Sequence, residues 1–238
     1  MASVKNKSYS EIEEIRVFNG KISLPEHDEI GDMHIATSVD TPMRDGAFDM
    51  DDNTKVELIQ DKFRDIMEIL GLDLSDDSLK GTPYRVAKMY VKEIFSGLNP
   101  ANKPDVKLFE NKYQYNEMLV EKNITFYSNC EHHFVPIIGT AHVAYISNGK
   151  VIGLSKLNRI VQYFAKRPQV QERLTMQIAS ELKNILHTED IAVLIDAKHL
   201  CVSSRGIEDV NSSTVTAEYS GAFKNSDKRN EFLKYVQI

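Results

Sequence analysis

The amino-acid sequence predicts an α+β fold in which an antiparallel sheet carries two helices on one face and follows a small helical subdomain. Three observations predict this class. The apolar period is helical in residues 55 to 98, strand-like runs begin beyond about residue 105, and two further helical stretches interrupt those runs. The order strand, strand, helix, helix, strand, strand is typical of helices that cover one face of a sheet.

The first 52 residues are expected to form an acidic tail or a loosely attached arm. Their apolar positions are scattered, and residues 1 to 54 hold five basic residues against twelve acids. The stretch ends in the acidic run DMDD. Because such a composition gives little basis for a packed core, we place the first domain boundary between residues 52 and 53.

Residues 53 to 104 are predicted to form the helical subdomain. Apolar residues recur at helical spacing before Gly71, which is a stop signal. In the run GTPYRVAKMYVKEIFSGL, Thr82 is expected to cap a second helix, Pro83 to occupy its first position and Gly97 to end it.

Residues 105 to 238 are predicted to form the sheet domain. The runs NITFYS and IIGTAHVAYIS are typical of strands, and the Asn-Gly pair at 148 and 149 indicates a turn. Helices are expected from Ser155 and after Pro168, because apolar residues there recur on one helical face. The runs IAVLIDAKHLCV and NSSTVTAEYSGAF complete the sheet.

Composition limits the classes of partner. With 42% hydrophobic and 27% charged residues, no run long enough to span a membrane and no apolar signal-peptide core, the chain is expected to be cytoplasmic and without a membrane partner. Residues 151 to 175 hold five basic residues and one acid, which favours a compact anionic ligand. The chain lacks the broad basic excess of a nucleic-acid-binding protein, and no GxxxxGK[ST] loop is present.

The run SNCEHHFVPIIG contains one of only two cysteines in the chain. His133 follows Cys130 by three positions, and the second cysteine, Cys201, lies beside His199 in KHLC. Thiolate and imidazole are preferred zinc ligands, and three protein ligands with one open position are typical of a catalytic zinc site. His132 and His199 would then be left for proton transfer.

Other interpretations of these residues remain open at this point. The cysteines could be small buried residues or a disulfide pair, although a reducing compartment favours thiols or metal ligands. A structural zinc site would recruit one of the histidines as a fourth ligand. Glu172 could simply favour the positive end of a helix dipole, and the basic residues near Ser155 could form a solvated face.

Four ordered motifs resemble the GTP cyclohydrolase I family: TPYRVAKMY, CEHHF, VIGLSKLNRIVQYFAKRPQVQERLT, and HLCV followed by RGI. The likeness extends from about residue 55 to the C-terminus. It implies a tunnelling fold in which subunits pair their sheets into a barrel, and a homodecamer of two stacked rings of five. It also implies a Zn²⁺ enzyme that opens the guanine imidazole ring of GTP, giving 7,8-dihydroneopterin triphosphate and formate, the first step of folate or pterin biosynthesis.

The resemblance also implies individual roles. The zinc ligands would be Cys130, His133 and Cys201, and the proton-transferring histidines His132 and His199. The residues that recognise guanine would be Gln171 and Glu172. Ribose and triphosphate contacts are implied for Ser155, Lys156, Arg159 and Arg205, and for Arg85 and Lys88 from a neighbouring subunit. The chain departs from the family pattern at Glu218 and Tyr219 and in the VSSRG approach to Arg205.

Chemistry supports the guanine assignment independently. Guanine presents two adjacent donors, its ring N–H and its amino group, and an ionised carboxylate such as Glu172 can accept both, whereas adenine cannot offer that pair. Two rival classes remain: a related tunnelling-fold enzyme acting on another purine or pterin, and a zinc-stabilised assembly module without enzymatic activity.

Overall fold

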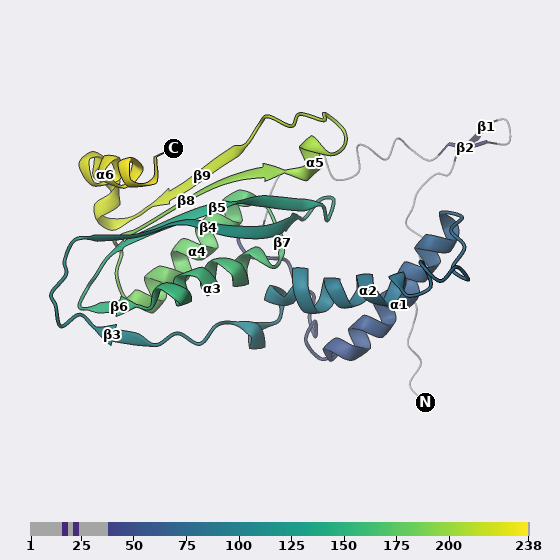
Figure 1. Cartoon of the computed structure of the whole chain (residues 1–238), viewed down its shortest axis with the longest axis horizontal. Coiled ribbons are helices and arrows are strands. Elements are labelled where there is room, and N and C mark those ends of the chain that lie inside the picture. Colours follow the sequence, from purple (N-terminus) through teal and green to yellow (C-terminus); the bar gives the residue numbers. More distant parts are fainter. Residues whose placement is uncertain (1–15, 19–20, 24–37, 238) are drawn as a thin grey trace. The chain divides into compact units, whose positions relative to one another are not determined.

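A computed structural model describes residues 16–18, 21–23 and 38–237 of the chain (Figure 1). The chain divides into two compact units, Met1–Ser38 and Val39–Ile238. In the first unit, β1 (Arg16–Phe18) and β2 (Lys21–Ser23) form an antiparallel pair that the sequence pattern did not indicate. The rest of the predicted tail up to residue 37 lies outside the described residues, and the predicted boundary at 52 and 53 stays a prediction.

The helical subdomain begins with α1 (Asp52–Ile69), which the apolar period predicted. The Asp51 carboxylate accepts hydrogen bonds from the backbone N–H groups of Asn53 at 2.9 Å and Thr54 at 3.1 Å. The acidic run that was read as the end of a tail therefore caps this helix, and α1 begins earlier than the apolar residues alone suggest. Gly71 follows the helix with φ +82°, as a stop signal should.

The second predicted helix is α2 (Thr82–Met89), and its N-cap lies one residue before the predicted N-cap, Thr82. Gly81 is its N-cap, and Thr82 is already helical. The chain continues through a π turn, η2 (Tyr90–Ile94), and two 3₁₀ turns, η3 (Ser96–Leu98) and η4 (Pro100–Asn102).

Gly97 was predicted to end the second helix, but α2 ends earlier, at Met89. Gly97 instead connects this subdomain to the residues that follow α3 (Leu154–Ala165). Its N–H donates to the Lys166 carbonyl at 2.9 Å, and its carbonyl accepts from Arg167 Nε at 2.8 Å. A Cβ at this position would lie 2.8 Å from the Lys166 carbonyl oxygen and would overlap that of Tyr163. Glycine is needed here because two backbones approach closely.

We expect Gly97→Ala to lower the free energy of unfolding by about 2–3 kcal/mol, because the added methyl group must displace backbone atoms. Urea denaturation followed by circular dichroism measures the effect. Gly153→Ala is the matched control, since the nearest atom to a Cβ there is 3.9 Å away. Equal destabilisation by the two substitutions would contradict the close-approach explanation.

The main sheet has the strand order β7-β4-β5-β8-β9. Its four long strands are β4 (Met118–Cys130), β5 (Pro136–Ile146), β8 (Ile191–His199) and β9 (Thr214–Tyr219), and neighbouring pairs among them run antiparallel, as predicted. The short β7 (Pro168–Gln169) pairs with β4 in parallel, so the sheet is not wholly antiparallel. A separate pair, β3 (Leu108–Glu110) and β6 (Lys150–Ile152), precedes α3.

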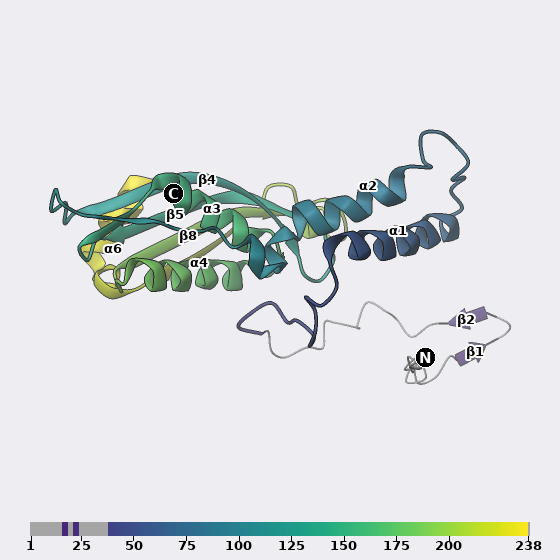
Figure 2. The same cartoon turned by 90° about the horizontal axis from the view of Figure 1, so that it is seen from below.

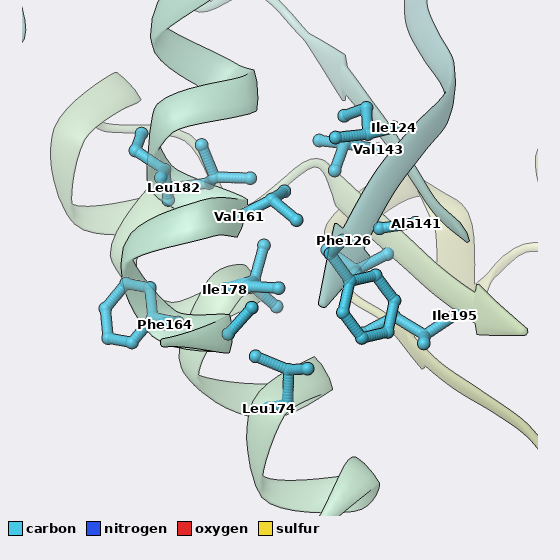
Figure 3. Packing of buried hydrophobic residues seen from close by; sticks show 14 of the residues in the cluster. Ile124, Phe126, Ala141, Val143, Val161, Phe164, Leu174, Ile178, Leu182 and Ile195 are labelled. Atoms are coloured by element: carbon cyan, nitrogen blue, oxygen red, sulfur yellow. The ribbon is translucent and has the colours of Figure 1, made fainter. Parts of the chain in front are cut away.

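One face of the sheet is covered by α3 and α4 (Gln171–Leu186), which confirms the two predicted helices (Figures 1 and 2). Figure 3 shows Val161 and Ile178 from these helices facing Phe126 and Val143 from the strands. These side chains are at most 1% exposed. The alternation of inward and outward residues along the strands produces this core, and the predicted mixed α+β class is confirmed.

The opposite face is covered at one end by a helix that the sequence analysis missed, α6 (Ser226–Val236). It follows η5 (Gly221–Lys224). The centroid of the Phe232 ring lies 6.1 Å from that of Phe223 and 6.3 Å from that of Tyr219. The two predicted helices therefore share one face of the sheet, and α6, which was not predicted, lies on the other. Tyr219, which departs from the family pattern, is a packing partner of α6.

Candidate metal centre and substrate site

A tight hairpin between β4 and β5 presents the CEHH run. The Cys130 N–H donates to the Val135 carbonyl at 2.9 Å, and the Cys130 carbonyl accepts from the Phe134 N–H at 2.8 Å. Phe134 adopts a left-handed backbone with φ 54°. These two bonds close the turn, so the histidines project from its tip beside the end of the sheet.

The second cysteine reaches the same place through strand pairing. His199, the last residue of β8, is opposite Ile137 of β5, and α5 (Leu200–Ser203) begins immediately after it. Cys201 therefore lies in a short helix and not on the strand end that the sequence suggested. The ligand atoms of Cys130, His133 and Cys201 all lie within 4.8 Å of one another.

This cluster fits a zinc ion. Tetrahedral zinc with bonds of about 2.0–2.3 Å holds its ligand atoms about 3.3–3.8 Å apart, and Cys130 Sγ lies 3.8 Å from His133 Nδ1. Both cysteines are free thiols, so the disulfide alternative is not realised. Burial, and secondly the neighbouring Cys130, raise the pKa of the Cys201 thiol. A bound cation would offset the mutual repulsion of two adjacent thiolates.

His132 also lies near the cluster, with its Nδ1 3.7 Å from Cys130 Sγ. It is nevertheless outside the group whose ligand atoms converge in the described residues. His133 alone of the two adjacent histidines is thus grouped with both thiols, and their separate roles stay a prediction.

His199 is held in one orientation by Gln171. Its Nε2 lies 2.7 Å from Gln171 Oε1, and the Gln171 Nε2 donates to the carbonyls of Ile195 at 3.2 Å and Thr214 at 2.8 Å. With the amide nitrogen committed to acceptors, its oxygen must face the histidine, so His199 Nε2 donates and Nδ1 keeps the lone pair. Burial lowers the pKa of His199, while the charge of Glu172 opposes that shift, so a neutral imidazole is favoured.

The two residues expected to recognise guanine differ in their surroundings. Gln171 is only 2% exposed, and its side-chain amide is used inside the protein. Glu172 is exposed on the first turn of α4, with its carboxylate available to a ligand. The structure thus gives Gln171 a supporting position, and Glu172 remains the residue suited to bind a base.

An ion pair that the sequence analysis missed lies beneath the hairpin. Arg173 binds Glu131 through two bonds, Nη1 to Oε2 at 2.6 Å and Nη2 to Oε1 at 3.1 Å. The two residues are 42 positions apart, and no spacing rule connects them. The only signal in the sequence was the position of Glu131 inside CEHH.

Three of the residues expected to contact triphosphate lie near the hairpin or on the helical subdomain. Arg205 Nη1 is 3.2 Å from His133 Nε2, which places this guanidinium beside the metal cluster. Arg85 and Lys88 are exposed on α2, one helical turn apart. The Arg85 guanidinium bonds within its own subdomain, to Thr82 Oγ1 at 2.7 Å.

Of the other three, Ser155 and Lys156 lie on the first turn of α3, and Arg159 lies one turn further along it, where it lines a pocket with Ser96 and Gly97. Near the start of α3, Asn158 contacts Glu121 of β4 at 3.2 Å. Nine residues of extended strand separate Glu121 from Cys130, which corresponds to about 30 Å. The start of α3 is therefore distant from the metal cluster of the same chain.

Comparisons with known proteins agree over most of the chain. The sequence model of a family described as GTP cyclohydrolase I matches residues 59–237. A protein of Flavobacterium johnsoniae named GTP cyclohydrolase 1 is 63% identical over 211 residues, which cover 89% of this chain and 95% of that protein. Proteins of the same name from Citrobacter koseri and Escherichia coli are each 53% identical over 204 residues, covering 85% of this chain and 92% of theirs.

Proposed function

Because the chain belongs to the GTP cyclohydrolase I family and is an enzyme of that family, we propose that it hydrolyses GTP to 7,8-dihydroneopterin triphosphate and formate with a zinc ion. The observation that carries this proposal is the convergence of Cys130, His133 and Cys201 within 4.8 Å, beside His199 and the exposed Glu172. That set combines a three-ligand metal site with a proton donor or acceptor and a carboxylate.

Cys130, His133 and Cys201 would hold the ion. Zinc, when bound with one open position, lowers the pKa of a coordinated water from its bulk value to about 7 and polarises bonds as a Lewis acid. The fold would position these ligands by holding the hairpin of Cys130 and His133 next to α5, which carries Cys201.

The protein's own groups account for recognition and proton transfer. Glu172 would accept hydrogen bonds from the ring N–H and the amino group of guanine, and this selects against adenine. His199 keeps a lone pair on Nδ1, and burial lowers its pKa and favours the neutral form, so its Nδ1 would be available to accept a proton and return it during ring opening. His132 would be the second proton carrier, because it adjoins the cluster without joining it.

The triphosphate would be held by cations without being cleaved. The chain has no P-loop, and the basic residues Lys156, Arg159 and Arg205 can bind phosphate oxygens. Since the start of α3 lies about 30 Å along β4 from Cys130, we propose that each site draws Lys156 and Arg159 from another subunit. A homodecamer of two stacked five-membered rings would provide such shared sites.

Mixing two inactive variants tests the shared site. We expect Cys130→Ala and Arg159→Ala to be inactive or weak alone, and co-assembled mixtures to recover up to about a quarter of wild-type turnover, because that fraction of sites draws both wild-type residues in an assembly of equivalent subunits. Turnover is measured on assemblies purified through two different affinity tags.

The matched control mixes Cys130→Ala with Cys201→Ser. These residues meet within one chain, so no wild-type metal cluster can form and turnover should stay absent. If mixed assemblies form but the Cys130→Ala and Arg159→Ala mixture recovers no turnover, the site is not shared between subunits.

In the part of the chain that the structure describes, no helix has the length and apolar character needed to cross a bilayer. A cytoplasmic location and entry of the product into folate or pterin biosynthesis stay proposals that rest on the family.

Incubation of the zinc-loaded protein with GTP tests the proposed function. It should release formate and yield a product that becomes a fluorescent pterin after oxidation, and ATP should give neither. A pterin product from a different purine or pterin substrate would favour the related tunnelling-fold enzyme. Zinc binding without turnover of any nucleotide would favour the assembly module.

A further inference from the structure

We propose that the Glu131–Arg173 ion pair positions the metal-binding hairpin relative to the turn of α4 that carries Glu172. The inference rests on the proposed function, because it assigns a role within that same site. Neither residue is assigned to the metal, the base or the triphosphate.

The geometry of the pair is specific. The two bonds, at 2.6 and 3.1 Å, join the two terminal nitrogens of Arg173, Nη1 and Nη2, to the two carboxylate oxygens of Glu131. The Arg173 side chain is 3% exposed and that of Glu131 is 19% exposed. A planar, two-bond contact fixes the direction as well as the distance between its partners, which a lysine could not do.

Both residues of the pair are adjacent in sequence to residues of the proposed site. Glu131 lies between Cys130 and His132, and Arg173 directly follows Glu172. The Glu131 N–H also donates to the Gln169 carbonyl at 3.0 Å, just before α4 begins. His132 Nε2 lies 3.9 Å from Glu131 Oε1. The Glu131 carboxylate thus lies near the proposed proton carrier and, through Arg173, joins the metal hairpin to the helix turn that would bind guanine.

Stability alone does not account for such a pair. Removing two charges from water is costly, and replacing a buried ion pair by apolar residues is often neutral or stabilising. What the pair supplies is a fixed separation between the metal cluster and Glu172. The purine must meet both at once, so an error of about 1 Å would misplace its reacting carbon.

The experiment uses the zinc-loaded, assembled enzyme with Glu131→Gln, Arg173→Lys, Arg173→Met and the double variant Glu131→Gln/Arg173→Met. Each single substitution is expected to lower kcat per bound zinc by about 10- to 100-fold, which is the usual range for residues that orient metal ligands. We expect kcat/KM for GTP to fall with kcat. The double variant should be no slower than the slower single variant, because both remove the same contact.

The matched control is a second ion pair of α4, Lys103 Nζ to Glu181 Oε2 at 2.8 Å, which lies outside the site. Glu181→Gln should keep wild-type kcat. A second readout needs no turnover: with Co²⁺ in place of zinc and no GTP, the visible absorption bands should shift in the Glu131 and Arg173 variants, because the ligand directions change, and should not shift in Glu181→Gln.

Three results would overturn the proposal. The first is wild-type kcat per bound zinc in Arg173→Lys together with an unchanged cobalt spectrum. The second is a loss of kcat in the double variant that equals the sum of the two single losses in free energy. The third is lowered thermal stability of the Glu131 and Arg173 variants with unchanged kcat per bound zinc. If the wild-type enzyme released no formate from GTP, the proposed function would fail, while the cobalt spectra would still decide whether the pair orients the hairpin.

Discussion

Removal of the metal is expected to abolish formate release from GTP, and addition of Zn²⁺ to restore it. Within the described residues, Cys130, His133 and Cys201 form the one group of three metal-ligating side chains whose ligand atoms converge. Without a cation to activate water, the remaining histidines have no nucleophile to act on. Dialysis against a chelator, followed by zinc analysis and a formate assay, measures the effect.

Substitution of one ligand should have the same result as chelation. Cys201→Ser is expected to bind zinc far more weakly, because a hydroxyl replaces a thiolate. Ser204→Ala, which changes a residue just beyond the same short helix, is the control that should keep its zinc. Full turnover by protein verified to be free of metal would contradict the metal assignment.

The largest effect that leaves the metal in place is expected from His132. We expect His132→Ala to retain one zinc per subunit and to bind GTP, but to lose about 10²- to 10⁴-fold in kcat, the usual contribution of a general acid or base. His133→Ala should lose the zinc itself. Both imidazoles approach Cys130 Sγ, at 3.7 and 3.8 Å, so distance to one thiol does not distinguish them. The convergence with Cys201 favours His133.

Metal analysis and single-turnover kinetics on the two variants decide the matter. His187→Asn is a suitable control, since His187 lies outside the site and has a left-handed backbone, φ 52°, that asparagine adopts readily. An empty His132→Ala together with a zinc-loaded His133→Ala would reverse the ligand assignment.

Elements with a long, regular apolar period could be predicted from the sequence. The spacing of Leu157, Ile160 and Val161 predicted α3, and each of these side chains is at most 1% exposed. Short elements could not be predicted, because the four residues of α5 and the two of β7 are too few to show a period. The helix α6 was missed because its few apolar residues, such as Phe232, are separated by charged residues. The contact of Phe232 with Tyr219 of β9 depends on tertiary packing, which spacing does not show.

The candidate site was partly predictable for similar reasons. Local spacing indicated Cys130 with His133, and the structure brings Cys201 to them, while metal binding itself stays a prediction. Spacing could not reveal that Gln171 supports His199, because that contact depends on how α4 packs against β8. Spacing predicted a helix from Ser155, but it could not show that this helix begins far from Cys130, since sequence order does not give distance across a sheet.

We propose that this chain removes carbon 8 of GTP as formate and leaves the triphosphate intact. The most direct measurement is nuclear magnetic resonance of the zinc-loaded enzyme with GTP carrying ¹³C at that carbon. We expect one labelled formate for each GTP consumed, with three phosphorus signals retained on the product. Release of inorganic phosphate or pyrophosphate with the label still in an intact guanine ring would contradict it.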